Sequence, residues 1–198
     1  MSDDRDMIAT LYGTPVSQTE YLKLEETAKE RHEYVAGRAY AMTGASFAHN
    51  ILVANLMHVL HDPVRRSGCF VISNDMKIKI ATLDSYYYPD VIVTCEKPAP
   101  TAVYVTAPHV IIEVLSPSTM SIDRREKLLA YRSIESLTEY VLVNQEKMQI
   151  EIYRKDDAGS WKLSVYKEND TVQFDSLPGG TLQIPVANIY DGLAFSGD

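Results

Sequence analysis

The segment that decides the fold is Val110-Ile111-Ile112-Glu113-Val114-Leu115, an apolar run interrupted by one carboxylate. Earlier in the chain, Pro89-Asp90-Val91-Ile92-Val93 has the same character. Apolar residues at successive positions are typical of central strands that are covered on both faces. The two runs therefore predict neighbouring buried strands, each of which carries one acidic side chain, Asp90 or Glu113.

Helices and further strands surround these two runs. Helical spacing of apolar residues predicts three helices, at about 17–29, 46–66 and 122–133, the first opened by a capping box of Ser17 and Glu20. A hairpin turning at Gly37 is expected at about 33–42. Segments bounded by turn formers predict strands at about 70–73, 76–80, 87–94, 110–115 and 140–143, followed by a C-terminal β-meander. The expected fold class is α/β or α+β, with a mixed sheet flanked by helices.

Size and composition fit one globular domain. The chain has 198 residues, of which 45% are hydrophobic and 23% charged. We expect a single domain over residues 1–198, with a core at about 15–155 and the meander at about 156–198. The acidic start, Met1-Ser2-Asp3-Asp4-Arg5-Asp6, is unlike a signal or transit peptide, and no apolar run has the length of a membrane span. These features predict a cytoplasmic protein.

The two cysteines, Cys69 and Cys95, lie in apolar stretches and have neither CxxC nor zinc-binding spacing. Free cysteines pack like small hydrophobic residues. We therefore expect buried, inert thiols at these positions in preference to a disulfide.

The two carboxylates in apolar strands predict a cation site. An ionised carboxylate in such a strand is unfavourable unless it is paired, hydrogen-bonded or bound to a cation. Two of them on adjacent strands would repel each other unless a metal lay between them. Asp90 and Glu113 therefore predict a metal site, although each could instead pair with an arginine or cap a turn. Mg²⁺ suits such a pair, because it favours one or two carboxylates and keeps several waters.

A helix is expected shortly after Glu113. Asp123, Lys127 and Tyr131 lie along one face of it, and its first turns are expected to overhang the two carboxylates. By spacing alone, Asp123 and Lys127 could equally form an ordinary ion pair between successive helical turns.

Taken in order, these residues resemble the PD-(D/E)XK nuclease superfamily and, within it, the Uma-type family of restriction-endonuclease-like proteins, a domain of unknown function. The Pro-Asp dipeptide alone is a weak signal, whereas the ordered set is a strong one. The matching positions, from about residue 15 to 155, are His32-Glu33-Tyr34-Val35-Ala36-Gly37-Arg38, His49, Tyr88-Pro89-Asp90-Val91, Ile112-Glu113-Val114-Leu115-Ser116-Pro117-Ser118-Thr119, Asp123, Lys127, Tyr131 and Glu139-Tyr140-Val141-Leu142-Val143.

The resemblance implies a restriction-endonuclease-like mixed sheet flanked by helices, and a metal-dependent endonuclease that hydrolyses phosphodiester bonds in DNA. Asp90 and Glu113 would ligate Mg²⁺, or Mn²⁺ in its place, with help from the backbone carbonyl of Val114. Lys127 would orient or activate the attacking water and offset charge on the phosphorane-like transition state, and Glu33 would be an auxiliary acidic residue beside the metal. Further side chains expected near the site or the substrate are His49, Tyr131 and Tyr88.

Two departures from the family pattern stand out. Leu115 occupies the position of the superfamily's usual lysine, so Lys127 would have to act from the helix instead. Val141 and Asn144 stand where the narrower family usually has tryptophan and aspartate, and we interpret both positions as structural.

The net charge of -8 opposes association with a polyanion and keeps other functions open. One alternative is a binding or regulatory module that keeps the fold but has little or no nuclease activity. Another is a hydrolase of small phosphate esters. Tyr86-Tyr87-Tyr88 could stack on bases, although such aromatics more often pack across a sheet. A homodimer is expected for a nuclease that cuts both strands, with the meander around Trp161 as a candidate interface.

Overall fold

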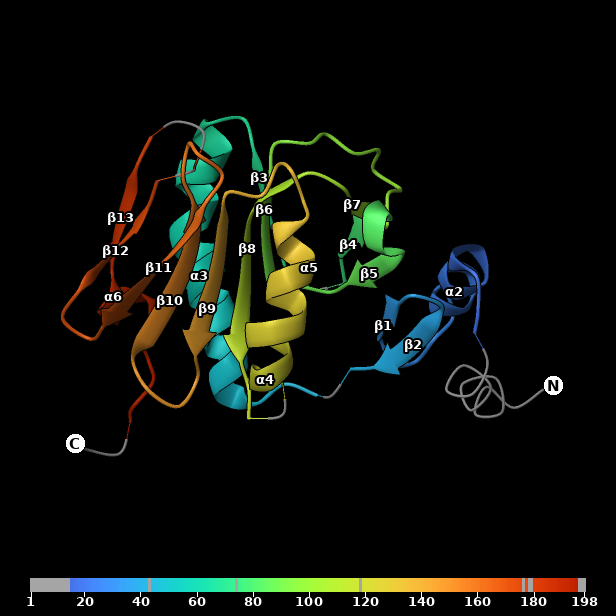
Figure 1. Ribbon diagram of the computed structural model, residues 1–198. Coiled ribbons are helices and arrows are strands. Elements are labelled where there is room, and N and C mark those ends of the chain that lie inside the picture. The colour runs from blue at the N-terminus through green and yellow to red at the C-terminus, as the bar shows by residue number, and fades with distance from the viewer. Residues whose placement is uncertain are drawn as a thin grey trace.

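A six-stranded mixed sheet forms the centre of the protein, shown as a computed structural model in Figure 1. The structure describes residues 15–42, 44–73, 75–117, 119–175, 177 and 180–195. Strands β8 and β9 are parallel, and the other neighbours in the sheet are antiparallel. In spatial order the strands are β11 (Trp161–Lys167), β10 (Gln149–Lys155), β9 (Glu139–Asn144), β8 (Pro108–Leu115), β6 (Val91–Thr94) and β3 (Phe70–Ser73).

Helices cover both faces of this sheet (Figure 1). Every residue of β6 is buried, and seven of the eight in β8 are, as the two apolar runs predicted. Helix α3 (Phe47–Arg66) packs on one face. On the other face lies a helical stretch made of α4 (Met120–Ile122), the π-helical turn η2 (Asp123–Lys127) and α5 (Leu128–Arg132).

Helix α3 follows the predicted range closely. Its N-cap Ser46 accepts a hydrogen bond from the backbone N–H of His49, which satisfies one of the free amides of the first turn. Its buried face repeats every fourth residue, as apolar spacing predicted. Pro63 lies inside the last turns, and the helix nevertheless continues to Arg66. The fully buried residues of that face are Leu52, Leu56, Leu60 and Val64.

A second sheet, at the N-terminal end of the molecule, has the strand order β2-β1-β5-β4-β7. The predicted hairpin is confirmed, since Ala36 and Gly37 both have positive φ, the backbone that a two-residue hairpin turn requires. The capping box of Ser17 and Glu20 is also confirmed, and it opens the short helix α2 (Gln18–Glu25). The strands are β1 (His32–Val35), β2 (Arg38–Ala41), β4 (Lys77–Ile80), β5 (Ser85–Tyr87) and β7 (Tyr104–Val105), with the 3-10 turn η1 (Ala81–Leu83) between β4 and β5.

The single strand expected at 87–94 is wrong, because the chain changes sheets inside it. Strand β5 ends at Tyr87 in the N-terminal sheet, and β6 starts at Val91 in the central sheet. Between them lies Pro89, which has no N–H to donate to a strand neighbour. Asp90 therefore stands at the junction of the two sheets.

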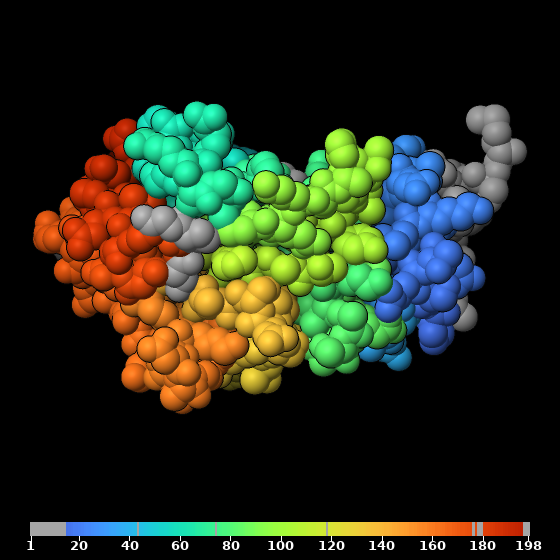
Figure 2. Space-filling model, turned by 90° about the horizontal axis from the view of Figure 1, so that it is seen from above, coloured from blue at the N-terminus to red at the C-terminus, as the bar shows by residue number. Residues whose placement is uncertain are grey.

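The C-terminal segments extend and cover the central sheet. Strands β10 and β11 join it as consecutive antiparallel neighbours, whereas β12 (Thr171–Phe174) and β13 (Leu182–Pro185) pair separately. These last two strands and the short helix α6 (Val186–Ile189) contribute to the same core as α3. In Figure 2 the C-terminal and N-terminal segments occupy opposite ends of the molecule.

The expectation of two free thiols is wrong, because Cys69 and Cys95 form a disulfide. Each cysteine flanks one of two antiparallel neighbours, β3 and β6, whose register pairs Phe70 with Thr94. That register places the two cysteines opposite each other, with their Cα atoms 4.2 Å apart.

The tyrosines at 86–88 pack inside the protein and do not form a stacking surface. Their side chains are almost completely buried, at 1%, 2% and 4% exposure. Tyr86 packs against Tyr21 and Tyr34, and Tyr87 packs against Tyr131. Of the remaining expectations, those at Met1–Asp6 and at Ser118 lie outside the described residues. None of the helices that the structure describes is long and apolar enough to cross a membrane.

Candidate active site

The two strand carboxylates meet at one end of the central sheet. Strands β6 and β8 are antiparallel, and Val91 pairs with Ile112, so that Asp90 and Glu113 are the next residues on each strand. The backbone N–H of Val114 donates a 2.7 Å hydrogen bond to Oδ2 of Asp90. The sheet itself therefore fixes the position of Asp90 beside the strand that carries Glu113.

Lys127 lies at the centre of a group of acidic side chains. Its Nζ is 3.1 Å from Oε1 of Glu113 and 2.9 Å from Oε1 of Glu33. It also lies 3.3 Å from Oδ1 of Asp123, one helical turn away. Glu33, Asp90, Glu113 and Asp123 are called the carboxylate cluster below. Lys127 is only 6% exposed, so this charge is held away from bulk water.

The turn after β8 brings Lys127 to this position. The Ser116 and Thr119 hydroxyls lie 3.0 Å apart, and Oγ of Ser116 accepts a hydrogen bond from the N–H of Thr119. The helical stretch then begins at Met120, five residues after the last residue of β8. Within it, Asp123 and Lys127 are the first and last residues of the π-helical turn, a feature that is frequent at functional sites.

Burial and neighbouring charges shift the pKa values of Glu113 and Lys127. Burial raises the pKa of the Glu113 carboxyl well above its ordinary value, and the attraction of Lys127 offsets only part of that shift. The other members of the cluster raise this pKa further. For Lys127, burial acts to lower the pKa, but Glu113 and Glu33 outweigh it and raise that pKa well above its ordinary value. The ammonium of Lys127 is therefore charged and acts as the counter-ion of the cluster.

The residues named as neighbours of the site take different positions. The hydroxyl of Tyr131 donates a 2.9 Å hydrogen bond to Oε1 of Glu113, the oxygen that Lys127 also contacts. Nε2 of His49 lies 3.2 Å from Oδ1 of Asp90. Both side chains therefore touch the strand carboxylates from opposite helices, Tyr131 from α5 and His49 from the first turn of α3.

Tyr88 reaches the site through its backbone, not its ring. Its N–H donates a 3.3 Å hydrogen bond to Oε1 of Glu33. Its hydroxyl points into a separate buried network, where it donates to Oε1 of Glu25 and accepts from Nζ of Lys77. Tyr88 therefore helps to position Glu33, and its ring is engaged in packing.

A cavity of about 630 Å³ opens over the carboxylate cluster. Its wall comes from the hairpin β1–β2, the start of α3, the ends of β6 and β8, and the helical stretch. Sequence reasoning missed part of this wall, including the apolar side chains of Tyr40, Met42 and Ile122. No motif could have identified them, because only the folded hairpin and helix bring them to one cavity.

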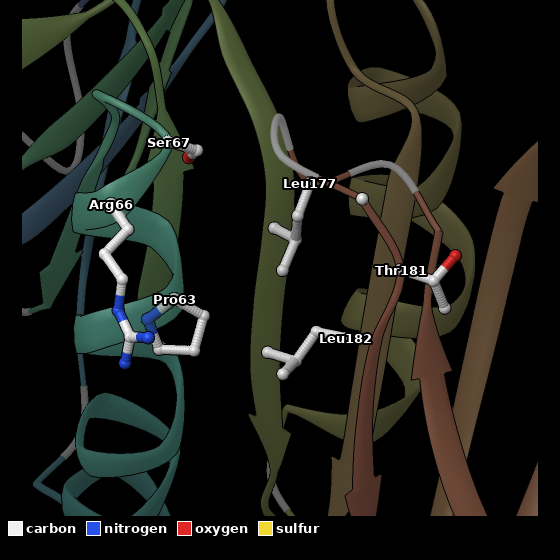
Figure 3. A pocket seen from close by; sticks show the side chains of 7 residues that line it. Pro63, Arg66, Ser67, Leu177, Thr181 and Leu182 are labelled. Carbon is white, nitrogen blue, oxygen red and sulfur yellow. The ribbon is translucent and has the colours of Figure 1, made fainter.

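A second cavity, of about 400 Å³, lies elsewhere (Figure 3). It is bordered by Pro63 and Arg66 at the end of α3, and by Leu177 and Leu182 from the C-terminal segment. None of its described lining residues belongs to the carboxylate cluster, so the chemistry of this chain is expected at the larger cavity.

The donor set of the larger cavity fits a hard divalent cation with few protein ligands. Among the described residues no group of three His, Cys, Asp or Glu side chains has the arrangement of a metal site. Mg²⁺, however, binds through one or two carboxylates and keeps several waters. Asp90 and Glu113 supply two such carboxylates, and a cation beside them would offset the repulsion from Asp123, Asp90 and Glu33 that raises the pKa of Glu113.

Comparisons with known proteins agree with this fold. Residues 18–187 match the Uma2 family, which is described as "Putative restriction endonuclease". A solved structure from Anabaena variabilis, described as a "putative nuclease belonging to DUF820", has a TM-score of 0.73 and 17% sequence identity. The match covers 89% of this chain and 98% of that one, and it shows a shared nuclease-like fold.

Two uncharacterized proteins of Synechocystis are similar along most of their length. The first is 35% identical over 181 residues, which are 91% of this chain and 94% of the relative. The second is 36% identical over 163 residues, which are 80% of this chain and 92% of the relative.

Proposed function

Because the chain belongs to the Uma2 family of restriction-endonuclease-like proteins, we propose that it is a Mg²⁺-dependent endonuclease that hydrolyses phosphodiester bonds in DNA. The observation that supports this proposal most strongly is the pairing of β6 with β8, which sets Asp90 beside Glu113 under a cavity that a substrate can enter. Other expectations from the sequence, a homodimer and a cytoplasmic location, stay predictions.

Asp90 and Glu113 are the proposed ligands of the cation, together with the backbone carbonyl of Val114. A bound divalent ion would supply positive charge to the phosphate and acidity to a water molecule. Lys127 and Tyr131 both donate a hydrogen bond to Oε1 of Glu113. Oε2 is therefore the oxygen proposed to face the cation. The N–H of Val114 and the imidazole of His49 hold the carboxylate of Asp90 in one orientation.

Lys127 is the proposed contact for the reacting phosphate. Its ammonium is charged, buried and fixed by Glu33, Glu113 and Asp123 at 2.9 to 3.3 Å. A positive group that is already oriented stabilises charge as it develops, without reorganising at the moment of reaction. Glu33 and Asp123 are therefore proposed as positioning residues that hold the ammonium near the scissile bond.

The proposal is tested by incubating the purified protein with plasmid DNA, single-stranded DNA and RNA, each with Mg²⁺ or Mn²⁺. The variants Asp90→Ala, Glu113→Ala and Lys127→Ala should lose cleavage, because they remove a cation ligand or the phosphate contact. The exposed Glu168→Ala is the matched control and should cleave normally. Wild-type activity in all three site variants, or no cleavage of any substrate by the wild type, would contradict the proposal.

A second candidate function is a binding or regulatory module with little or no nuclease activity. The charge of the cavity favours it, because the described part of the lining has five carboxylates and one lysine. Stabilisation of the protein by Mg²⁺ against heat, without cleavage of any nucleic acid, would support this candidate.

A further inference from the structure

Three large apolar side chains stand exposed around the mouth of the cavity. Tyr40 lies in β2, Met42 lies just past the end of β2, and Ile122 is the last residue of α4. Their exposed fractions are 49%, 37% and 43%. Single exposed apolar residues are common on proteins, but three that line one cavity form a surface that can bind an apolar face of a ligand. These three side chains are called the apolar mouth.

The apolar mouth lies beside the proposed chemistry. Tyr40 is the cross-strand partner of Glu33, which contacts Lys127. Ile122 directly precedes Asp123, which also contacts Lys127. A group held by the apolar mouth would therefore sit next to the ammonium proposed to meet the phosphate.

The charge of the cavity does not suit a double helix. Proteins hold duplex DNA largely through many contacts from lysine and arginine to closely spaced phosphates. Among the described lining residues of this cavity, Lys127 is the one lysine or arginine, against five carboxylates: Glu33, Asp90, Glu113, Asp123 and Glu126. The volume of about 630 Å³ is in the range of pockets for single small molecules, not of grooves for a duplex.

We propose that this site acts on unpaired nucleotides, in a single strand or an overhang, with one base stacked on Tyr40 and bordered by Met42 and Ile122. The inference rests on the proposed function and names its substrate class. A flipped or unpaired base presents an apolar face that an aromatic ring can stack on in any sequence. The phosphate next to that base then points toward Lys127. The tyrosines at 86–88 cannot take this role, because they are buried.

The substrate class is tested with three DNA oligonucleotides of one sequence, incubated with Mg²⁺ or Mn²⁺: a single strand, a blunt duplex, and a duplex with an overhang. The same three substrates made of RNA show whether the site prefers unpaired DNA or unpaired RNA. The single strand and the overhang should be cut, and the blunt duplex should be cut at least tenfold more slowly. Cleavage of the blunt duplex at an equal or higher rate would overturn this inference and leave the proposed function intact. Absence of cleavage in every arm would overturn both.

The stacking role of Tyr40 is tested by binding, measured as the fluorescence anisotropy of a labelled single strand with Ca²⁺ in place of Mg²⁺. Stacking on an aromatic side chain contributes about 5- to 150-fold to affinity, so Tyr40→Ala should weaken binding by that factor. Tyr40→Phe keeps the ring and should bind like the wild type. The matched control is Phe70→Ala, an exposed aromatic on β3 outside the described cavity lining, and it should also bind like the wild type. Unchanged binding by Tyr40→Ala, or an equal loss in Phe70→Ala, would overturn the role of Tyr40.

Discussion

Replacing Lys127 with methionine keeps the length of the side chain and removes the charge that three carboxylates contact. In the wild type, Glu33, Glu113 and Asp123 all lie within 3.3 Å of the ammonium. Lys127 and Glu113 are 6% and 4% exposed, so water cannot replace the missing cation without opening the structure. We expect Lys127→Met to be strongly destabilised when no divalent ion is present.

The size of the effect follows from the burial of the partners. Removal of one member of a buried ion pair costs about 3–5 kcal/mol, because the other charge is left uncompensated. For a chain of this length, about 1 kcal/mol shifts the melting temperature by roughly 2–4 °C, so a decrease of about 6–20 °C is expected. The loss of stability should be smaller in Lys127→Met/Glu113→Gln, since the second change removes the charge of one of the three carboxylates that contact Lys127.

The loss of stability in Lys127→Met should also depend on pH and on the Mg²⁺ concentration. Burial already raises the pKa of Glu113, and without Lys127 it would be higher still. A carboxyl whose pKa is raised on folding is tolerated below its ordinary pKa and opposes folding as pH rises through the raised value. The difference in unfolding free energy from the wild type should therefore grow as pH rises above the ordinary pKa of a glutamate, and saturating Mg²⁺ should restore part of the lost stability.

Urea denaturation with and without Mg²⁺, followed by circular dichroism, measures these quantities. The exposed Lys167→Met is the matched control, which should stay within about 0.5 kcal/mol of the wild type. An unfolding free energy of Lys127→Met within about 1 kcal/mol of the wild type at pH 8 would show that Lys127 does not balance the charge of the carboxylate cluster.

Three further predictions concern other contacts. Tyr131→Phe removes one hydrogen bond to Glu113 and should lower the unfolding free energy by about 1.5–3 kcal/mol in urea denaturation; a loss under 0.5 kcal/mol would contradict it. Arg154→Ala leaves the fully buried Glu139 without its ion partner and should cost about 3 kcal/mol, with cleavage per folded molecule unchanged. Reduction of the disulfide, whose cysteines are 26 residues apart, should cost roughly 2–4 kcal/mol, and an equal stability with and without reductant would argue against the bond.

Much of the fold could be predicted because its elements have strong local patterns. The range of α3 is clear from the apolar residues at every fourth position of its buried face and from its serine N-cap. The hairpin of β1 and β2 was predictable from Gly37, and β8 from its apolar run at 110–115, which only Glu113 interrupts. Each of these features lies within a few residues of sequence, where helical and strand periodicities act.

The errors arose where the structure depends on contacts between distant segments. The β-branched residues 91–94 follow closely on Tyr87 and Tyr88, a pattern that favours one strand, whereas the change of sheet around Pro89 follows from which neighbours β5 and β6 find. The disulfide depends on the register of β3 against β6, which spacing between Cys69 and Cys95 cannot reveal. In both cases contacts between distant segments override the local preference for a strand or for a free cysteine.

The candidate site shows the same division. Asp90 and Glu113 could be predicted as site residues because an ionised carboxylate in an apolar strand is unfavourable unless it is paired, hydrogen-bonded or bound to a cation. Lys127 came mainly from the family resemblance, and the structure adds that it contacts three acidic side chains at once. Asp123 looked like an ordinary partner of Lys127, but its 2% exposure makes it part of the buried cluster.

The most direct test of the central claim is a crystal structure of the protein soaked with Mn²⁺, analysed by anomalous scattering. We expect one manganese ion bound by the carboxylates of Asp90 and Glu113, with Lys127 beside it, and no such ion in Asp90→Asn. Manganese bound only elsewhere, or absent from this site at saturating concentration, would contradict the claim that these two strands hold the metal of a nuclease.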